Sequence, residues 1–498
     1  MKRHPNLLFI YTDEQRFDTL AAYGNSTIRM PAVNALAEDS HVFLKTYVTQ
    51  PVCTPSRSSL MTGLWPHQNG LVGNNIALKP DTRCFPELLE AGGSTDYVSG
   101  HFGKWHLGDE IYQQHGFQEW GATEDTYFAF YGPERNQDKD RSAYDRWLRA
   151  HGATPVNWVS GVPGVGERCE FRDRFTREHI SALPEHLGRP AFLAESAREF
   201  ITKHRHEPFA LFVNFLEPHM PFHGPRDNEY SPASVGLPPD FALDELESLS
   251  NRDRRNAVNY KEYGFEGHDL RNEADWRSLN ARYWGLCSQV DAAVGRILKA
   301  LSDEGLYDDT IVVFTSDHGD MMGGHALLGK GTQYDGSTRV PLLIKQPDQR
   351  GQILHADPVS HIDLVPTLLD MMGADPNQGL PGSTWRPDLA AGKSPSGDVF
   401  VEWNPKRFFD VCRNPEASEA DCTLEYIRTI VTADLMKLNW SSSGEHQLFD
   451  LAQDPAERRN CIADREQAGR IRELVSRIQA WQENVADEAV LPSVETEP

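Results

Sequence analysis

The chain has 498 residues, and its 73 acidic against 49 basic side chains give a formal net charge of -24 at pH 7. Such a body repels nucleic acid and anionic membranes at long range, so we expect neither as a partner, and an anionic substrate would need a locally basic pocket. With 39% hydrophobic residues the chain can bury a substantial core, as large soluble enzymes do.

The N-terminal stretch MKRHPNLLFIYTDE is basic, then briefly hydrophobic, then acidic. The hydrophobic run is too short for the core of a secretory signal and ends without a small-residue cleavage site. No later run approaches the length of a membrane span. We therefore interpret residues 6–11 as a first buried strand and expect a cytoplasmic protein.

Short β-rich runs alternate with helical patterns along the chain, which is typical of a mainly parallel sheet covered by helices. The clearest strand candidates are 6–11, 97–99, 209–214 and 310–315. Hydrophobic residues at three- and four-residue spacing predict helices over 193–201 and 279–301.

The second half of the chain predicts a long loop and a change of domain. Residues 220–275 are polar, contain prolines and have weak periodicity, so we expect a surface loop that shapes a substrate entrance. Residues 379–397, rich in Gly, Pro and Ser, indicate a linker, and a helix is predicted at about 465–485. We expect a catalytic α/β domain over 1–378 and a smaller α+β domain with a polar tail over 379–498.

Polar residues follow each of the four predicted strands: Asp13 and Glu14, Lys104 and His106, His219, and Asp317 and His318. In open α/β sheets ligands bind beyond the carboxyl ends of the strands, so these four segments are expected to converge on one site. The acidic residues and His318 form a plausible cluster for a divalent metal. Each pair alone would be better explained as a helix cap or a turn, and only the two pairs together favour a metal site.

The seven cysteines are scattered and have no spacing typical of a disulfide framework or a zinc site. Cys287 falls on the apolar stripe of a predicted helix, so we expect a buried structural thiol. Cys412 and Cys422 could pair, although we favour free thiols. Cys53 stands apart because it begins the pentapeptide CTPSR.

That pentapeptide predicts a helix start. Pro55 fixes the backbone and Ser56 can cap a following helix, which places Cys53 near a helix N-terminus where an anion is favoured. Arg57 adds a fixed charge one turn further along, suited to bidentate contact with oxygens. The alternative is that CTPSR is merely a capped turn.

The run PVCTPSRSSLMTGLWPHQNG resembles the signature of the formylglycine-dependent (type I) sulfatases. GKWHLG resembles their second signature, DEQRFD and SDHGD resemble their metal-binding motifs, and His219 in EPHMPF and Lys330 in LGKGTQYD match a histidine and a lysine of the family. The resemblance implies an alkaline-phosphatase-like sandwich, in which helices flank a large, mostly parallel sheet and a smaller C-terminal α+β domain follows.

The resemblance also implies a cofactor chemistry. A separate formylglycine-generating enzyme would oxidise Cys53 to an aldehyde, whose hydrate attacks sulfur. One divalent cation would be held by position 53 and by the residues Asp13, Glu14, Asp317 and His318. Calcium is the usual ion of the family, but Glu14 and His318 stand where other residues are common, which leaves manganese or magnesium open.

The remaining roles are likewise implied by the family. Lys104 and Lys330 would hold the sulfate oxygens, and Arg57 would steady the modified residue. His219, with Lys330, would protonate the leaving oxygen, while His106 would take the proton whose loss releases sulfate. These cations would supply the basic pocket that the acidic body requires.

Two rival functions share the fold: a phosphonate monoester or phosphodiester hydrolase with the same nucleophile, and a non-catalytic binding protein. The expected substrate is a small-molecule or saccharide sulfate ester. We expect residues 110–190 to line the entrance together with 220–275. Aromatic residues there suit sugars, aryl groups or a choline headgroup, and they are Trp120, Tyr127, Phe128, Trp147 and Trp158. The C-terminal tail could serve contacts in a homo-oligomer.

Overall fold

The structure is a computed structural model that describes residues 4–123, 141–153, 158–159, 180–181, 183–244, 246–265, 268–405 and 425–494. Several residues considered above lie outside this part of the chain, namely Tyr127, Phe128, Cys412, Cys422 and the side chain of Trp158. The domain boundary at 378/379 and the cytoplasmic location stay predictions from the sequence.

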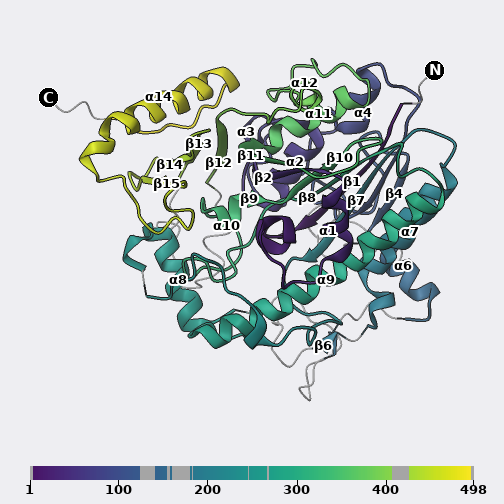
Figure 1. Ribbon diagram of the computed structural model, residues 1–498, viewed down its shortest axis with the longest axis horizontal. Coiled ribbons are helices and arrows are strands. Elements are labelled where there is room, and N and C mark those ends of the chain that lie inside the picture. The colour runs from purple at the N-terminus through teal and green to yellow at the C-terminus, as the bar shows by residue number, and fades with distance from the viewer. Residues whose placement is uncertain are drawn as a thin grey trace.

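A nine-stranded sheet forms the centre of the molecule, with strand order β11-β2-β10-β8-β1-β7-β3-β4 and β9 paired to β2 (Figure 1). The strands run parallel except for β10 and β9, which are antiparallel to their neighbours. Their bounds are β1 Asn6–Asp13, β2 His41–Tyr47, β3 Val98–Gly103, β4 Glu119–Ala122, β7 Phe209–Pro218, β8 Thr310–Ser316, β9 Arg339–Val340, β10 Leu342–Lys345 and β11 Ile353–Ser360.

Helices cover both faces of this sheet, because its central strands are hydrophobic on both sides. In β1, Leu8 and Ile10 pack into one core cluster and Leu7 and Phe9 into another. One face is covered by α1 (Pro31–Glu38), α7 (Arg189–Lys203) and the long α9 (Glu273–Asp303). The other is covered by α2 (Cys53–Thr62), α4 (Phe85–Ala91) and α11 (Leu364–Met371) (Figure 1). The expected sandwich is confirmed.

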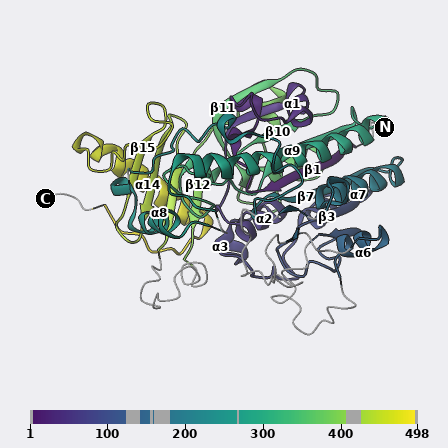
Figure 2. The same ribbon diagram turned by 90° about the horizontal axis from the view of Figure 1, so that it is seen from below.

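The C-terminal part forms a separate, smaller unit of one sheet and one helix next to the large sheet. Strands β12 (Val399–Trp403), β13 (Ile427–Val431), β14 (Met436–Ser441) and β15 (Gln447–Asp450) form an antiparallel sheet in that order. Helix α14 (Ala468–Val485) packs its apolar face on this sheet through Leu474 and Ile478. Both views show this α+β unit at one end of the molecule (Figures 1 and 2).

The remaining elements are short, apart from α8, and connect these layers. They are α3 Pro66–Asn69, α6 Ala143–Ala150, α8 Asn251–Tyr263, α10 Asp335–Thr338, α12 Arg386–Ala390, β5 Trp158–Val159 and β6 Ile180–Ser181. None of the helices in the described part of the chain is long and apolar enough to cross a membrane. Cys287 is fully buried in α9, as expected.

The prediction of a loop over 220–275 is wrong in one respect, because the segment contains the 13-residue helix α8. The Ser250 side chain caps this helix by accepting a hydrogen bond from the Asp253 backbone N–H. Its few buried side chains include Ala257 and Tyr260, too few to give a clear periodic pattern. The helix therefore depends on tertiary packing that the sequence pattern does not reveal.

Candidate active site

The four predicted strands are immediate neighbours in the order β8-β1-β7-β3, and all four are parallel. Their carboxyl ends consequently lie along one edge of the sheet. Asp13 ends β1, and the other polar residues predicted from the sequence follow the ends of β3, β7 and β8. Topology therefore brings these segments, which are far apart in sequence, to one place.

Gly103 is required where β3 ends. Its φ is 119°, and an added Cβ would lie 1.9 Å from the carbonyl oxygen of Asn214 in β7. The same carbonyl accepts a hydrogen bond from the Lys104 backbone N–H at 3.1 Å. This close approach, which only glycine permits, sets where the Lys104 side chain leaves the strand.

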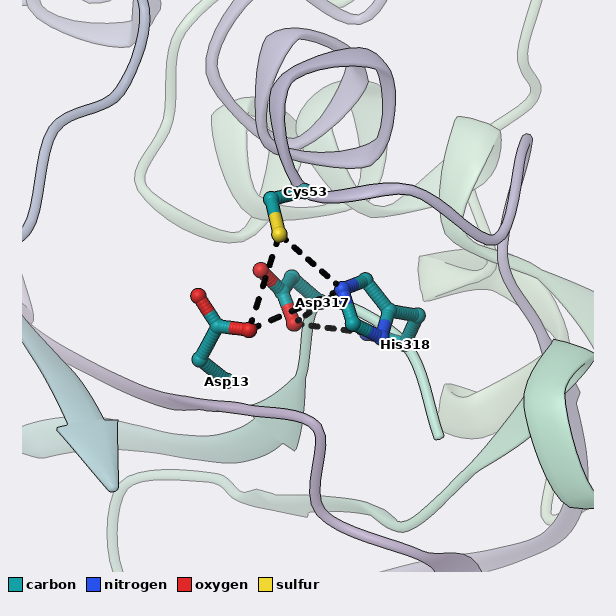
Figure 3. Close-up of side chains that lie close together, drawn as sticks. All are labelled: Asp13, Cys53, Asp317 and His318. Atoms are coloured by element: carbon teal, nitrogen blue, oxygen red, sulfur yellow. Dashed lines mark hydrogen bonds and ion pairs between the residues drawn. The ribbon is translucent and has the colours of Figure 1, made fainter. Parts of the chain in front are cut away.

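Cys53 is the first residue of α2, and its side chain points at the acidic cluster (Figure 3). The Sγ atom lies 3.3 Å from His318 Nε2 and 3.7 Å from Asp13 Oδ1. The predicted cap is wrong, because the residue before the helix is Val52, which makes no side-chain cap. Ser56 instead donates its hydroxyl to the carbonyl of Asp317, which fixes α2 to the end of β8.

The cluster of Asp13, Cys53, Asp317 and His318 has a donor set that fits a divalent cation. One ligand atom from each residue lies within 4.8 Å of all the others, and all four residues are buried. Two carboxylates and an imidazole suit calcium, magnesium or manganese, with nitrogen favouring the transition metal. Asp13 uses Oδ2 to bind Arg57 and Lys104, and it turns Oδ1 towards Cys53 and His318.

Glu14 lies beside this cluster and takes a different partner. Its Oε1 is 2.6 Å from the Lys330 ammonium, and its Oε2 accepts a hydrogen bond from the backbone N–H of Met220 at 3.3 Å. The residue has a positive φ of 67°, and its carbonyl accepts a hydrogen bond from Tyr283. That backbone bend turns the chain immediately after β1.

Arg57 ties the two aspartates together. Its Nε donates to Asp317 Oδ2 at 2.7 Å, its Nη2 donates to Asp13 Oδ2 at 2.8 Å, and its Nη1 donates to the Lys104 carbonyl at 2.9 Å. The side chain is fully buried and lies over the Tyr11 ring. The positive guanidinium thus compensates the negative charges of the two carboxylates, which burial would otherwise destabilise.

Two lysines reach the same point from different segments. Lys104 Nζ donates to Asp13 Oδ2 at 2.6 Å, and Lys330 Nζ lies 4.0 Å from Asp13 Oδ1. Burial opposes ionisation of Asp13, but the charges of Lys104 and Arg57 hold the pKa of this carboxyl well below its usual value. Burial alone would lower the pKa of Lys330, but the neighbouring carboxylates of Glu14 and Asp13 raise it, so the ammonium stays charged.

The two histidines are held neutral. Burial, followed by the charge of Lys104, lowers the pKa of His106 well below its usual value, and burial with Lys330 does the same for His219. His106 Nε2 is 2.9 Å from Asn75 Oδ1, an arrangement that places the proton on Nε2 and leaves Nδ1 as the basic nitrogen. His219 Nδ1 contacts the carbonyl of Met220.

Sequence reasoning missed three polar residues that support this site. Glu110 accepts hydrogen bonds from the backbone N–H groups of Trp105 at 2.9 Å and of His106 at 2.6 Å. Asn74 accepts one from the Thr54 backbone N–H, and Asn75 contacts His106. None of the three stands in a motif that could have singled it out.

Trp120 packs against the segments on either side of Lys104. Its ring stacks on His101 at a centroid distance of 4.3 Å, and its indole N–H donates to the Glu110 carbonyl at 2.7 Å. Trp147 packs against Tyr144 on α6. The structure thus makes Trp120 a support for the segment that carries Lys104.

Comparisons with known proteins agree with this geometry. The Sulfatase family model matches residues 5–374, and a model for the C-terminal region of N-sulphoglucosamine sulphohydrolase matches residues 323–484. The uncharacterized sulfatase YidJ of Escherichia coli strain K12 is 30% identical over 473 residues, covering 93% of this chain and 84% of the relative. An arylsulfatase of Clostridium perfringens is 26% identical over 487 residues, covering 94% and 92%.

The fold is also shared with a solved phosphonate monoester hydrolase of Agrobacterium radiobacter. That structure has a TM-score of 0.78 and 26% identity, with 97% of this chain and 96% of that chain covered. The alkaline-phosphatase-like fold expected from the sequence is thereby confirmed. With a family model spanning most of its length and relatives aligned along nearly all of it, the chain is a sulfuric ester hydrolase and belongs to the sulfatase family.

Proposed function

We propose that this protein hydrolyses sulfate monoesters of small molecules or saccharides through a formylglycine made from Cys53. The observation that carries the proposal is the position of Cys53 at the start of α2, with Sγ 3.7 Å from Asp13 Oδ1 and 3.3 Å from His318 Nε2. The buried cations Arg57 and Lys104 and the partly exposed Lys330 surround the same point and suit an anionic ester.

The unmodified thiol is poorly suited to catalysis. Burial, with Asp13 nearby, raises the pKa of Cys53 to about 11, so the thiol is protonated at neutral pH. A reactive position 53 therefore favours a chemically altered residue. Hydrated formylglycine, made by a separate maturation enzyme, supplies one hydroxyl that attacks sulfur and a second whose deprotonation allows release.

A divalent cation would be held by Asp13, Asp317, His318 and position 53, with Glu14 next to them. When bound, such an ion supplies charge neutralisation and lowers the pKa of a coordinated hydroxyl. Calcium is our first choice from the family resemblance. The His318 nitrogen keeps manganese and magnesium as alternatives.

The side chains of this chain divide the remaining tasks. Lys104 and Lys330 bind sulfate oxygens, and each is already positioned by a carboxylate, Asp13 and Glu14 respectively. Arg57 orients position 53 and the two aspartates. His106, neutral with Nδ1 basic, takes the proton from the second hydroxyl, and the charged ammonium of Lys330, next to His219, delivers a proton to the leaving oxygen.

Intact-mass measurement tests the modification. After co-expression with a formylglycine-generating enzyme, conversion of Cys53 should lower the mass by roughly 18 Da, and the loss should map to the peptide carrying Cys53. A Cys53→Ala variant is the matched control and should keep its full mass. An unmodified wild-type chain would favour the non-catalytic binding protein instead.

Phosphonate monoester or phosphodiester hydrolysis is the second candidate. The observation that favours it is the similarity to the phosphonate monoester hydrolase along 97% of this chain. Rates on an aryl sulfate, an aryl phosphonate and a phosphodiester with one common leaving group would separate the two. Negligible turnover of the sulfate beside rapid turnover of a phosphorus ester would reject our first choice.

A further inference from the structure

A second group of metal-ligand side chains lies outside the active site. Among the residues that the structure describes, Cys84, Glu87 and His115 bring a sulfur, a carboxylate oxygen and an imidazole nitrogen within 4.8 Å of one another. Cys84 immediately precedes α4, Glu87 lies in its first turn, and His115 comes from the loop between β3 and β4. The group therefore joins two segments that are separate in sequence.

Glu87 is held against the start of α4 by its own carboxylate. The Cys84 backbone N–H donates to Glu87 Oε2 at 2.8 Å, while the Cys84 side chain makes no capping hydrogen bond. Serine, threonine or aspartate caps a helix well, so capping alone gives no reason for a sulfur atom here. Burial, followed by the nearby Glu87 carboxylate, raises the pKa of the Cys84 thiol well above its usual value, so the thiol stays protonated until a cation displaces its proton.

His115 completes the group from the other side. Its Nδ1 lies 3.8 Å from Glu87 Oε2, so the imidazole faces the carboxylate from a separate segment of the chain. The side chain of His115 is 5% exposed and that of Glu87 is 31% exposed, so an ion would enter past Glu87.

We propose that Cys84, Glu87 and His115 bind a thiophilic divalent cation of the zinc class, with water as a fourth ligand. One sulfur, one nitrogen and one oxygen donor are the ligands that zinc takes in proteins, at bond lengths of about 2.0–2.3 Å. The three ligand atoms lie within 4.8 Å of one another, and they must move slightly closer for one cation to reach all of them at such bond lengths. Binding replaces the thiol proton of Cys84, which is released to solvent, so affinity rises with pH.

The position of this site links it to the active-site segment. The His115 ring lies 5.9 Å from the ring of Trp105, which stands between Lys104 and His106 in the chain. The same segment is held at its far end by the hydrogen bond from the Leu78 N–H to the Leu107 carbonyl at 2.7 Å. A bound cation would thus brace the loop that carries two proposed active-site residues.

Cadmium titration tests the proposal, because the ultraviolet sulfur-to-cadmium charge-transfer band reports thiolate ligation directly. Full-length protein with Cys53→Ser removes the thiol of the active-site cluster. We expect this protein to develop the band with one equivalent of Cd²⁺ and to lose it when Cys84→Ser is added. His115→Gln or Glu87→Gln should weaken binding about 10- to 100-fold.

These variants spare the helix, which keeps the test decisive. Serine caps a helix as well as or better than cysteine, and glutamine keeps an oxygen acceptor for the backbone N–H of residue 84, so α4 should remain folded by circular dichroism. Cys461→Ser, at a partly exposed thiol, is the matched control and should leave the band unchanged. A band that survives Cys84→Ser, or no band in the parent protein, would overturn the assignment.

Discussion

Glu110 should hold the catalytic segment in place through its two backbone contacts. The carboxylate, 3% exposed, receives the N–H groups of Trp105 and His106 at 2.9 and 2.6 Å. His106 has a positive φ of 59°, a conformation that most residues avoid and that needs support from its surroundings. The clamp therefore fixes the segment from Lys104 to His106, although Glu110 itself is a positioning residue.

Glu110→Gln changes one acceptor oxygen into an NH₂ group that faces a backbone N–H. The variant loses one charge-assisted hydrogen bond and leaves a buried donor unpaired, which together cost about 2–5 kcal/mol. We expect part of this cost to appear as a displaced loop rather than as unfolding. A shift of about 1 Å in a catalytic group lowers the rate on the order of 100-fold.

The assay is steady-state hydrolysis of an aryl sulfate by formylglycine-containing protein, with urea unfolding measured alongside. We expect kcat to fall about 100-fold while KM changes much less, because the clamp positions reacting groups. Glu90→Gln, at an exposed position on α4, is the matched control and should behave as wild type. Wild-type kcat in a folded Glu110→Gln protein would refute the reasoning.

Buried charged groups, the acidic cluster and a buried histidine give three further predictions. Arg57→Ala removes the shared partner of Asp13 and Asp317. In urea titrations this variant should lose about 3–5 kcal/mol of the free energy of unfolding, and a loss below about 1 kcal/mol would contradict the pairing. Chelation of divalent ions should lower the unfolding temperature of the wild-type protein measurably, whereas an unchanged temperature and activity would argue against a cation at the acidic cluster. Burial lowers the pKa of His41 from 6.5 to about 4, so the folded protein favours the neutral imidazole. This preference stabilises the fold fully above pH 6.5. The contribution, about 2 kcal/mol after allowance for solvent screening, is lost as the pH falls from 6.5 towards 4. His41→Gln should therefore flatten the pH dependence of urea unfolding between about pH 4 and 6.5, and an unchanged slope would assign that dependence to other groups.

The strands of the site were predictable because their sequences are hydrophobic on both faces. Parallel strands buried on both sides give short continuous apolar runs, and the polar residues after each run mark the functional edge of the sheet. This rule places Asp13 and Asp317 together from the amino-acid sequence alone. Their partner Arg57 needed the additional prediction of a helix start at CTPSR.

The missed features depend on contacts across the fold. Ser56 was expected to cap a helix, but its hydroxyl bonds to the carbonyl of Asp317, 261 positions away. Glu110 is a single acidic residue in a loop. The residues around it in the sequence do not indicate that its carboxylate accepts hydrogen bonds from the backbone N–H groups of Trp105 and His106. Helix α8 is polar along most of its length, so its pattern resembled a loop.

The most direct test of the account relates activity to the chemical state of Cys53. Preparations with different fractions of formylglycine, set by the amount of co-expressed maturation enzyme, would be assayed on one aryl sulfate and analysed by intact mass. We predict that the rate per mole of protein rises in proportion to the modified fraction, extrapolates to zero without modification and is absent in Cys53→Ala. A rate that is independent of the modified fraction would contradict the account.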